Sequence, residues 1–414
     1  MSPIEVNTLI VGGGQAGIAM SVHLARAGID HVVLEKNRIA EAWRTARWDS
    51  LVANGPAWHD RFPDKEFSDT DGAAFATKHS CARYFEEYVA ENSLPLHTGI
   101  EVTKAAPSPD GGYLVETNAG TYQTRNIVAA TGPFQVPVIP PIVPSEAPAK
   151  QIHSQSYRNP NQLADGAVLI VGAGSSGVQI ADELRRAGRD VYLSVGPHER
   201  PPRRYRGEDY CHWLGVLGKW QMKTPPAGRE HVTISVSGAH GGHTVDFRDL
   251  AQSGIRLVGM AKSYESGALL FEDDLAKNIS DGDDNHLGLL DEVDAYVADH
   301  GLDNPPEENA KLIGPDPDCL ANPTLRLNLQ EAGIATIIWA TGYRQDFSWL
   351  EVDTFNERGQ PIHTEGVSPV PGIYFLGLPW LSMRGSSFIW GVYVDAERLA
   401  GEISRHTEPA VEAV

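Results

Sequence analysis

The sequence predicts an α/β fold with two Rossmann-like dinucleotide-binding domains, the second inserted into a discontinuous first. Two observations carry this prediction. An apolar strand, glycines at the G-x-G-x-x-G spacing and a helix follow one another at residues 8–26 and again at 167–184. An apolar strand that ends in Ala-Thr-Gly also occurs twice, at 128–132 and at 335–342. Two copies of one pattern in a single chain make coincidence remote.

Composition limits the class of protein. A chain of 414 residues, 41% hydrophobic and 21% charged, is typical of a globular protein with two or three domains. The net charge of −20 argues against nucleic acid, because phosphate binding needs a basic face. The sequence shows no secretory leader and no apolar run long enough to span a membrane, and its three cysteines lie far apart. We therefore expect a cytoplasmic protein that binds neither nucleic acid nor membrane.

Each glycine of the first copy has a physical reason. The first allows a tight turn, the second lets the backbone approach a pyrophosphate, and the third lets the helix pack closely on the strand. The helix that follows offers N–H groups and a partial positive charge to the phosphates. Glu35 closes the next strand, where a carboxylate accepts a ribose hydroxyl. The residues predicted to hold this first dinucleotide are Gly12, Gly14, Gln15, Ala16, Gly17, Glu35 and Lys36.

The segment that follows is dense in Trp, Arg and Pro and has no regular period. Its aromatic and guanidinium groups, Trp43 and Arg44 among them, are suited to pack on a cofactor ring or to hold its phosphates. Trp43 and Trp48 are equally well explained as core anchors of an irregular loop, so both interpretations stay open. Small residues at the two Ala-Thr-Gly strand ends complete the candidate cofactor contacts: Thr131, Gly132, Ala340, Thr341 and Gly342.

The second copy lies beyond a proline-rich crossing. Residues 133–149 contain six prolines, which suits an extended connection between domains. A chain that binds two dinucleotides has the layout expected for a flavin and a nicotinamide cofactor that exchange hydride. The second dinucleotide is predicted to bind Gly172, Gly174, Ser175, Ser176 and Gly177.

The strand after the second fingerprint ends without an acidic residue. Ser194 stands about where Glu35 stands in the first copy, and His198 and Arg200 follow it. A carboxylate would repel a ribose 2′-phosphate and basic side chains would pair with it, so we predict NADPH rather than NADH. A solvated loop is the alternative interpretation of the basic residues, and Glu199 counts against the prediction.

The remaining patterns complete the order of elements. An amphipathic helix around Leu290 and Val293 lies inside the acidic run 272–308, which is either a solvated surface or a docking surface for a partner. His240 and His243 lack the carboxylates or thiolates of a metal site, so we expect none. We expect helices at 80–92 and 394–404 and strands at 99–104, 113–117, 122–130 and 372–378. The predicted domains are 1–150 together with 325–414, and 151–324 between them.

Taken together, these motifs resemble the class B, or flavin-containing, FAD-dependent monooxygenases. Within that group the chain is similar to small bacterial members and to plant indole-pyruvate monooxygenases. The resemblance rests on both fingerprints, both Ala-Thr-Gly segments and the pair His153 and Tyr157. That pair matches half of the signature F-x-G-x-x-x-H-x-x-x-[YF], whose Phe and Gly are replaced by Ala147 and Ala149.

The resemblance implies FAD on the first fingerprint and NADPH on the second. It implies that NADPH reduces FAD, that dioxygen forms a C4a-hydroperoxyflavin, and that one oxygen atom is inserted into a small organic substrate by N- or S-oxygenation. Asn54 falls near the reactive edge of the flavin in this scheme. The further contacts implied are Trp43, Arg44 and Val102 for FAD, and Ser194, His198 and Arg200 for the 2′-phosphate.

Three alternatives stay open. A Baeyer–Villiger oxygenase would act on a ketone with the same cofactors. A disulfide reductase would need paired cysteines, whereas Cys81, Cys211 and Cys319 are isolated in the sequence. A non-oxygenating NADPH–flavin oxidoreductase or a nucleotide-binding sensor would use the same fingerprints. The substrate and the oligomeric state, a homodimer included, are left open by the sequence.

Overall fold

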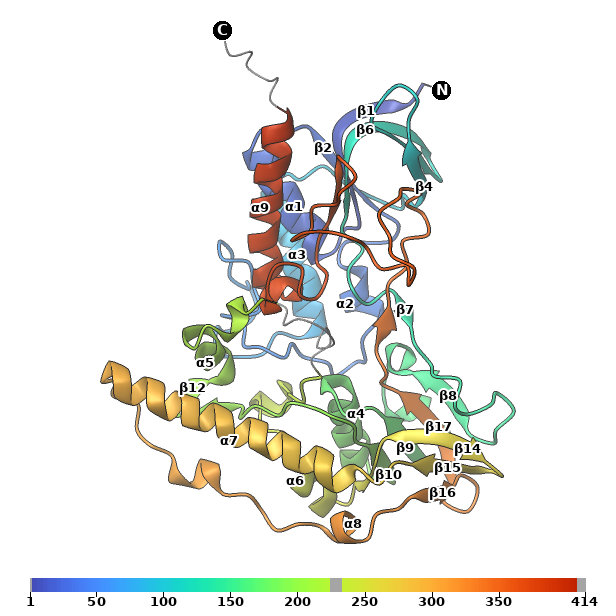
Figure 1. Cartoon of the computed structure of the whole chain (residues 1–414), viewed down its shortest axis with the longest axis vertical. Coiled ribbons are helices and arrows are strands. Elements are labelled where there is room, and N and C mark those ends of the chain that lie inside the picture. The colour runs from blue at the N-terminus through green and yellow to red at the C-terminus, as the bar shows by residue number, and fades with distance from the viewer. Residues whose placement is uncertain (1, 224–232, 408–414) are drawn as a thin grey trace.

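The chain is described by a computed structural model over residues 2–223 and 233–407. Residue 1, residues 224–232 and residues 408–414 lie outside the described part, and they fall in both predicted domains. Two units, each built on its own sheet, lie one above the other in Figure 1. The predicted α/β class is confirmed.

The first unit is built on a seven-stranded mixed sheet of order β3-β2-β1-β6-β5-β4, with β19 paired to the second half of β6. The strands β3, β2, β1, β6 and β19 are parallel, and β4, β5 and β6 form an antiparallel meander. Central strands of such a sheet are covered on both faces, which is why Leu9, Ile10 and Ile127 are fully buried. The strands are β1 (Ile4–Val11), β2 (His31–Glu35), β3 (Leu96–Thr98), β4 (Val102–Pro107), β5 (Tyr113–Thr117), β6 (Gly120–Ala129) and β19 (Ile373–Phe375).

Helices from both ends of the chain cover this sheet. The C-terminal helix α9 packs beside α1 (Figure 1), and the ring centroids of His23 on α1 and Tyr393 on α9 lie 4.3 Å apart in an edge-to-face arrangement. Helix α3 begins after Thr77, whose side chain accepts the N–H of Ser80, and it buries the predicted aromatic face. The helices are α1 (Gln15–Arg26), α2 (Glu41–Thr45), α3 (Lys78–Glu91) and α9 (Ile389–Thr407). The return of the chain end to the first sheet, through β19 and α9, is confirmed.

The second unit is built on a five-stranded parallel sheet of order β13-β10-β9-β17-β8. Its strands are β8 (Lys150–His153), β9 (Ala167–Val171), β10 (Val191–Ser194), β13 (Arg256–Val258) and β17 (Ile334–Trp339). Beside it lie the antiparallel sheet β14 (Ala261–Glu265), β15 (Ala268–Phe271) and β16 (Arg326–Asn328), and the pair β11 (Arg204–Tyr205) and β12 (Glu208–Asp209). The helices are α4 (Ser175–Arg186), α5 (Tyr210–Val216), α6 (Phe247–Gln252), α7 (Leu275–His300) and α8 (Asp318–Ala321).

Short 3₁₀ turns connect these elements. They are η1 (Ser154–Ser156), η2 (Pro160–Gln162), η3 (Lys219–Gln221), η4 (Ala239–Gly241), η5 (Glu308–Lys311) and η6 (Arg384–Ser387).

The two passages of the chain between the units run side by side. Strand β7 (Val136–Pro137) leads into the second unit, β18 (Tyr343–Arg344) leads out of it, and the two strands pair antiparallel. The strand pairing corrects the predicted division at residue 325, because β17 pairs with β8 and β9 inside the second unit. The second Ala-Thr-Gly strand therefore belongs to the sheet of the second fingerprint, and the chain leaves the second unit only after residue 342.

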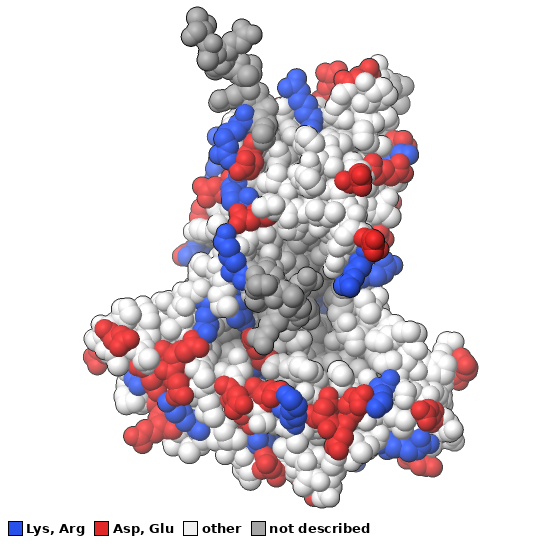
Figure 2. Space-filling view, in the orientation of Figure 1, with Lys and Arg blue, Asp and Glu red and all other residues white. Residues whose placement is uncertain are grey.

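Helix α7 holds much of the acidic run. Its apolar face buries Leu290 and Val293 among its core contacts, as predicted. Several of its carboxylates are paired with bases, Asp281 with Lys277 and Asp291 with Lys311. In the face of the molecule shown in Figure 2, acidic and basic side chains are mixed over the lower unit. Among the described helices, none is long and apolar enough to cross a membrane.

Candidate functional site

The first fingerprint forms the tight turn that the glycines predict. Gly12 has a φ of +112°, and a Cβ there would lie 2.6 Å from the carbonyl oxygen of Ala130. A Cβ on Gly17 would lie 1.8 Å from the carbonyl oxygen of Gly12, so helix and turn touch backbone to backbone. Gly14 is the N-cap of α1, carries no side-chain cap, and has no other atom within 4 Å of its Cβ position. The open helix start therefore fits a phosphate.

Glu35 lies directly against this turn. Its carboxylate accepts the N–H of Gly13 at 2.6 Å and that of Asn37 at 2.8 Å. Its carbonyl oxygen accepts the N–H of Ile100, two residues before Val102 at the start of β4. Glu35, predicted to accept a ribose hydroxyl, therefore lies beside the open helix start. Lys36, also predicted, is exposed.

Residues of the aromatic and basic segment after β2 were interpreted either as cofactor contacts or as core anchors, and they differ in how far they are buried. Trp48 is only 5% exposed and belongs to the core of the second unit. Trp43 is half-buried and packs against the cores of both units. Arg44 forms an ion pair with Glu86 of α3, so its guanidinium is held inside the first unit. Arg47, which the sequence interpretation did not single out, lies over the rings of Trp43 and Phe134.

The second fingerprint repeats the geometry of the first. Gly172 has a φ of +109°, and a Cβ on Gly177 would lie 1.8 Å from the carbonyl oxygen of Gly172. Each Ala-Thr-Gly segment lies against its own fingerprint: Ala130 N–H bonds Val11, and Ala340 N–H bonds Val171.

The helix start of the second fingerprint is covered by the chain itself. Residues 233–237, here called the strap, cross the N-terminus of α4. The carbonyl oxygen of Ile234 accepts both the N–H of Ser175 at 2.8 Å and its hydroxyl at 2.7 Å. The hydroxyl of Ser235 donates to the carbonyl oxygen of Ala173 at 2.5 Å. The strap thus uses two donors that the fingerprint would offer to a phosphate, whereas α1 has no comparable cover at Gly14.

Strand register corrects the position predicted for the ribose-facing residue. In the first unit Val11 pairs with Leu34, and in the second Val171 pairs with Ser194. The equivalent of Glu35 is therefore Val195, one residue beyond the predicted Ser194. The hydroxyl of Ser194 is buried and donates to the carbonyl oxygen of Gly259. An apolar side chain stands where the acidic residue would be.

Arg200 and His198 are also not free for a 2′-phosphate, which corrects the prediction made for them. Arg200 is 2% exposed, and its guanidinium donates to Asp283 at 2.5 and 3.0 Å and lies 3.6 Å from Asp246. Arg248 pairs with the other oxygen of Asp283 at 2.8 Å, so the aspartate joins two arginines. His198 packs on Phe247 with its pKa lowered by burial, and it is therefore neutral near pH 7. The basic loop is part of a buried ion network.

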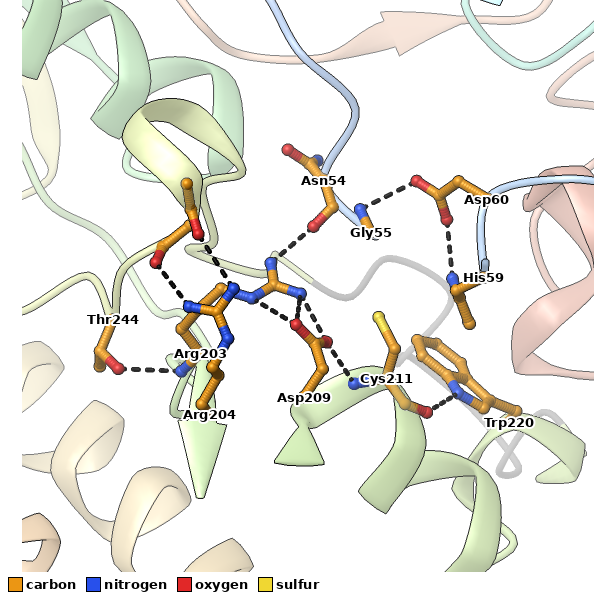
Figure 3. Close-up of polar contacts among 12 residues, drawn as sticks. Asn54, Gly55, His59, Asp60, Arg203, Arg204, Asp209, Cys211, Trp220 and Thr244 are labelled. Atoms are coloured by element: carbon orange, nitrogen blue, oxygen red, sulfur yellow. Dashed lines mark hydrogen bonds and ion pairs between the residues drawn. The ribbon is translucent and has the colours of Figure 1, made fainter. Parts of the chain in front are cut away.

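Asn54 lies where the two units meet (Figure 3). Its side-chain oxygen accepts Nε2 of Gln179 on α4 at 2.8 Å, and its carbonyl oxygen accepts Nη1 of Arg203 at 2.6 Å. Arg203 is 3% exposed and makes a two-pronged ion pair with Asp209. The contacts of Gln179 and Arg203 with Asn54 could not be predicted from the sequence, because they join segments more than 100 residues apart.

A buried histidine and three aromatic rings lie next to this junction. His59 accepts the indole N–H of Trp390 at 3.0 Å, so its other ring nitrogen donates to Asp60 at 2.7 Å. Trp220, whose indole donates to Cys211, packs against His59 and Phe388. Phe388 and Trp390 thus join an aromatic cluster between the units.

The start of α1 and the loop after β10 both contact one C-terminal segment. The side chain of Gln15, at the start of α1, donates to the carbonyl oxygen of Ser387 in η6 at 2.9 Å. At the other end of η6, Arg384 pairs with Glu199, just beyond β10, at 2.7 Å. The ends of both fingerprint regions therefore lie within reach of one short turn. This shared junction is the candidate active site.

Other candidates lie elsewhere. His153 donates to the carbonyl oxygen of Gly342 at the crossing strands, whereas Tyr157 is fully buried and donates to Glu183 within the second unit. The three cysteines are free thiols, and burial raises the pKa of each. Among the described residues there is no group of three or more His, Cys, Asp or Glu side chains that could hold a metal ion.

Comparisons with known proteins agree with this architecture. Residues 9–215 match the family described as pyridine nucleotide-disulphide oxidoreductase. An uncharacterized oxidoreductase CzcO-like from Geobacillus kaustophilus is 33% identical over 97% of this chain and 99% of that protein. The indole-3-pyruvate monooxygenase YUCCA1 of Oryza sativa subsp. japonica is 29% identical over 92% of this chain and 88% of its own.

Among solved structures, a flavin-containing monooxygenase from Stenotrophomonas maltophilia shares the fold. It matches with a TM-score of 0.68 at 19% identity, over 98% of this chain and 100% of that chain. The chain therefore belongs to the pyridine nucleotide-disulphide oxidoreductase family and is an oxidoreductase.

Proposed function

We propose that the protein is an FAD-dependent monooxygenase that uses NADPH to insert one oxygen atom of O2 into a small organic substrate, as an N- or S-oxygenation. The balance is NADPH, a proton, O2 and substrate giving NADP⁺, water and the oxygenated substrate. The observation that carries the proposal is that one short turn, η6, contacts the start of the first fingerprint helix at Gln15 and the loop of the second unit at Glu199. The predicted domains follow: the first unit binds FAD and the second binds NADPH.

The first unit fits FAD by its donors and its space. The open start of α1 offers N–H groups to the pyrophosphate, and Glu35 lies where it would accept a ribose hydroxyl. Thr131 and Gly132 follow β6 at the same sheet edge, where Gln135 donates to both residues and fixes the turn. When bound, FAD supplies the redox chemistry: it accepts hydride from the nicotinamide and activates dioxygen.

The second unit is the proposed NADPH site. The glycine turn is formed by residues that include Gly172, Gly174, Ser176 and Gly177. Ser175 can bind a phosphate only if its N–H and hydroxyl release the carbonyl oxygen of Ile234. NADPH is the donor in the family that the motifs resemble. Arg200 and His198 already contact other residues of the protein, so neither is free to bind a 2′-phosphate. We therefore expect the kcat/KM values for NADPH and NADH to differ by no more than about tenfold, or about 1.4 kcal/mol.

The junction supplies positioning and exclusion of water. Asn54 is held at both of its oxygens by residues of the second unit, and its amide nitrogen is the donor that it can turn toward the flavin edge. The aromatic cluster of Trp220, Phe388 and Trp390 is the proposed apolar wall against which a substrate packs. No side-chain nucleophile is required, since the flavin carries the hard chemistry.

Labelled dioxygen tests the proposal. The FAD-loaded protein, NADPH and ¹⁸O2 are incubated with a panel of amines, thioethers and ketones, and the masses of the products are measured by mass spectrometry. Incorporation of one ¹⁸O into an amine or a thioether is the expected result. Ester formation from a ketone would establish Baeyer–Villiger chemistry instead. NADPH consumption that yields only hydrogen peroxide with every substrate would refute oxygenation, and absence of flavin reduction would refute the redox assignment.

A further inference from the structure

Gln179 has a side-chain amide whose orientation is fixed by two acceptors. Its Nε2 donates to Oδ1 of Asn54 at 2.8 Å and to the carbonyl oxygen of Val236 at 2.7 Å. A flipped amide would place its oxygen against two other oxygens and lose both hydrogen bonds. Nε2 therefore faces Asn54 and the strap at the same time.

This arrangement determines the orientation of Asn54 in turn. Since Oδ1 of Asn54 faces the donor of Gln179, its Nδ2 group points away from α4. The backbone of Asn54 is held separately, because its carbonyl oxygen accepts Nη1 of the buried Arg203. With its backbone held, Asn54 can still rotate its side-chain amide, and the hydrogen bond to Gln179 prevents that rotation.

We infer that Gln179 is a positioning residue, which makes Asn54 present an N–H donor, rather than an oxygen acceptor, to the junction between the two dinucleotides. The inference rests on the proposed function, which places that junction at the flavin edge. Gln179 lies two residues after Gly177 on α4, so the helix that would carry the nicotinamide phosphates also orients Asn54. A donor that points at the junction is suited to stabilise negative charge there.

The chain offers a matched control for this role. Gln151 on β8 also uses Nε2 to donate to two carbonyl oxygens, those of Val143 and Pro144, at 3.1 and 3.0 Å. Its side-chain oxygen accepts the indole of Trp339 inside the second unit. Gln151→Glu removes the same amide donor as Gln179→Glu, but the hydrogen-bond partners of Gln151 do not include Asn54.

The test compares Gln179→Glu, Asn54→Ala, the double variant and Gln151→Glu in the FAD-loaded protein. A carboxylate at 179 accepts rather than donates, so it turns the Asn54 amide around. We expect Gln179→Glu to slow flavin reduction at saturating NADPH, or to raise peroxide release per NADPH, about tenfold. In the Asn54→Ala background the same change should have no further effect. Gln151→Glu should leave both readouts within twofold.

A readout that needs no turnover separates this inference from the proposed function. The side-chain NH2 resonance of Asn54, identified by its loss in Asn54→Ala, should shift in Gln179→Glu and stay in place in Gln151→Glu. An unshifted resonance, or equal effects of Gln179→Glu with and without Asn54, would overturn the inference. If the wild-type protein does not reduce its flavin with NADPH, the proposed function fails while the resonance still tests the contact. Gln179→Met, which also removes the donor, serves if Gln179→Glu does not fold.

Discussion

The carboxylate of Glu35 accepts a hydrogen bond of 2.6 Å from the backbone N–H of Gly13, across the turn of the first fingerprint. A charged acceptor of this kind contributes about 1.5–3 kcal/mol. We expect Glu35→Gln to raise the Kd for FAD about tenfold to a hundredfold, measured by titrating the apoprotein and following flavin fluorescence. Glu5→Gln, on the exposed start of the same sheet, is the control. An unchanged Kd for Glu35→Gln would remove this residue from the FAD site.

Arg200 is a stability residue in this structure rather than a nucleotide ligand. Its loss leaves Asp283 with one arginine fewer in a buried network, and breaking such a pair costs about 3–5 kcal/mol. We expect Arg200→Met to lower the free energy of unfolding in urea by about that amount, and the ratio of kcat/KM values for NADPH and NADH to stay within twofold. The exposed Arg204→Met serves as control. A collapse of NADPH use alone would restore the phosphate role.

We expect the strap to weaken nucleotide binding to the second fingerprint, because it occupies donors at the start of α4. The hydroxyl of Ser235 ties it to Ala173, and this bond contributes about 1 kcal/mol. Ser235→Ala should therefore lower the KM for NADPH about fivefold while the Kd for FAD stays unchanged, in steady-state and titration measurements. Ser263→Ala, on the partly exposed hairpin β14–β15, should change neither value. A rise in KM would show that the strap helps to hold the nucleotide.

His23 makes folding sensitive to acid. It is buried between α1 and α9, and burial lowers its pKa from 6.5 to about 4. Between these values the unfolded chain binds a proton that the folded chain does not, so the free energy of unfolding falls as pH falls. We expect the drop between pH 7.5 and pH 5, from urea titrations, to be about 2 kcal/mol smaller in His23→Phe than in the wild-type chain.

A control on another histidine keeps the pH comparison specific. His97→Gln, on the exposed edge strand β3, should leave the pH dependence of unfolding as it is in the wild-type chain. Equal slopes for His23→Phe and wild type would contradict the assignment to His23.

Much of the fold could be predicted from the sequence, because it depends on residues that are close together in the chain. Both glycine turns depend on residues within six positions of one another, and each requires the φ values or the close approach that only glycine allows. The helix faces and the return of β19 to the first sheet follow from periodicity and chain order. These features need no knowledge of distant partners.

The errors share a cause: each depends on a pairing between distant segments. Whether Ser194 or Val195 faces the ribose is decided by the register of β10 on β9, and a shift of one residue reverses the face. Arg200 is committed by Asp283, more than 80 residues away. Strand β17 was assigned to the wrong sheet, because an Ala-Thr-Gly ending does not say which strands lie beside it. The contacts of Gln179 and Arg203 with Asn54 were missed for the same reason.

The crossing of β7 and β18 gives the protein a modular construction. Pro137 and Tyr343 are paired neighbours in this crossing, so the chain enters the second unit and leaves it at adjacent positions. Every strand of the first sheet lies outside residues 138–342. A shortened chain in which a tight turn joins these two positions would keep all seven strands in their order, and a different nucleotide-binding unit could be grafted at the same seam.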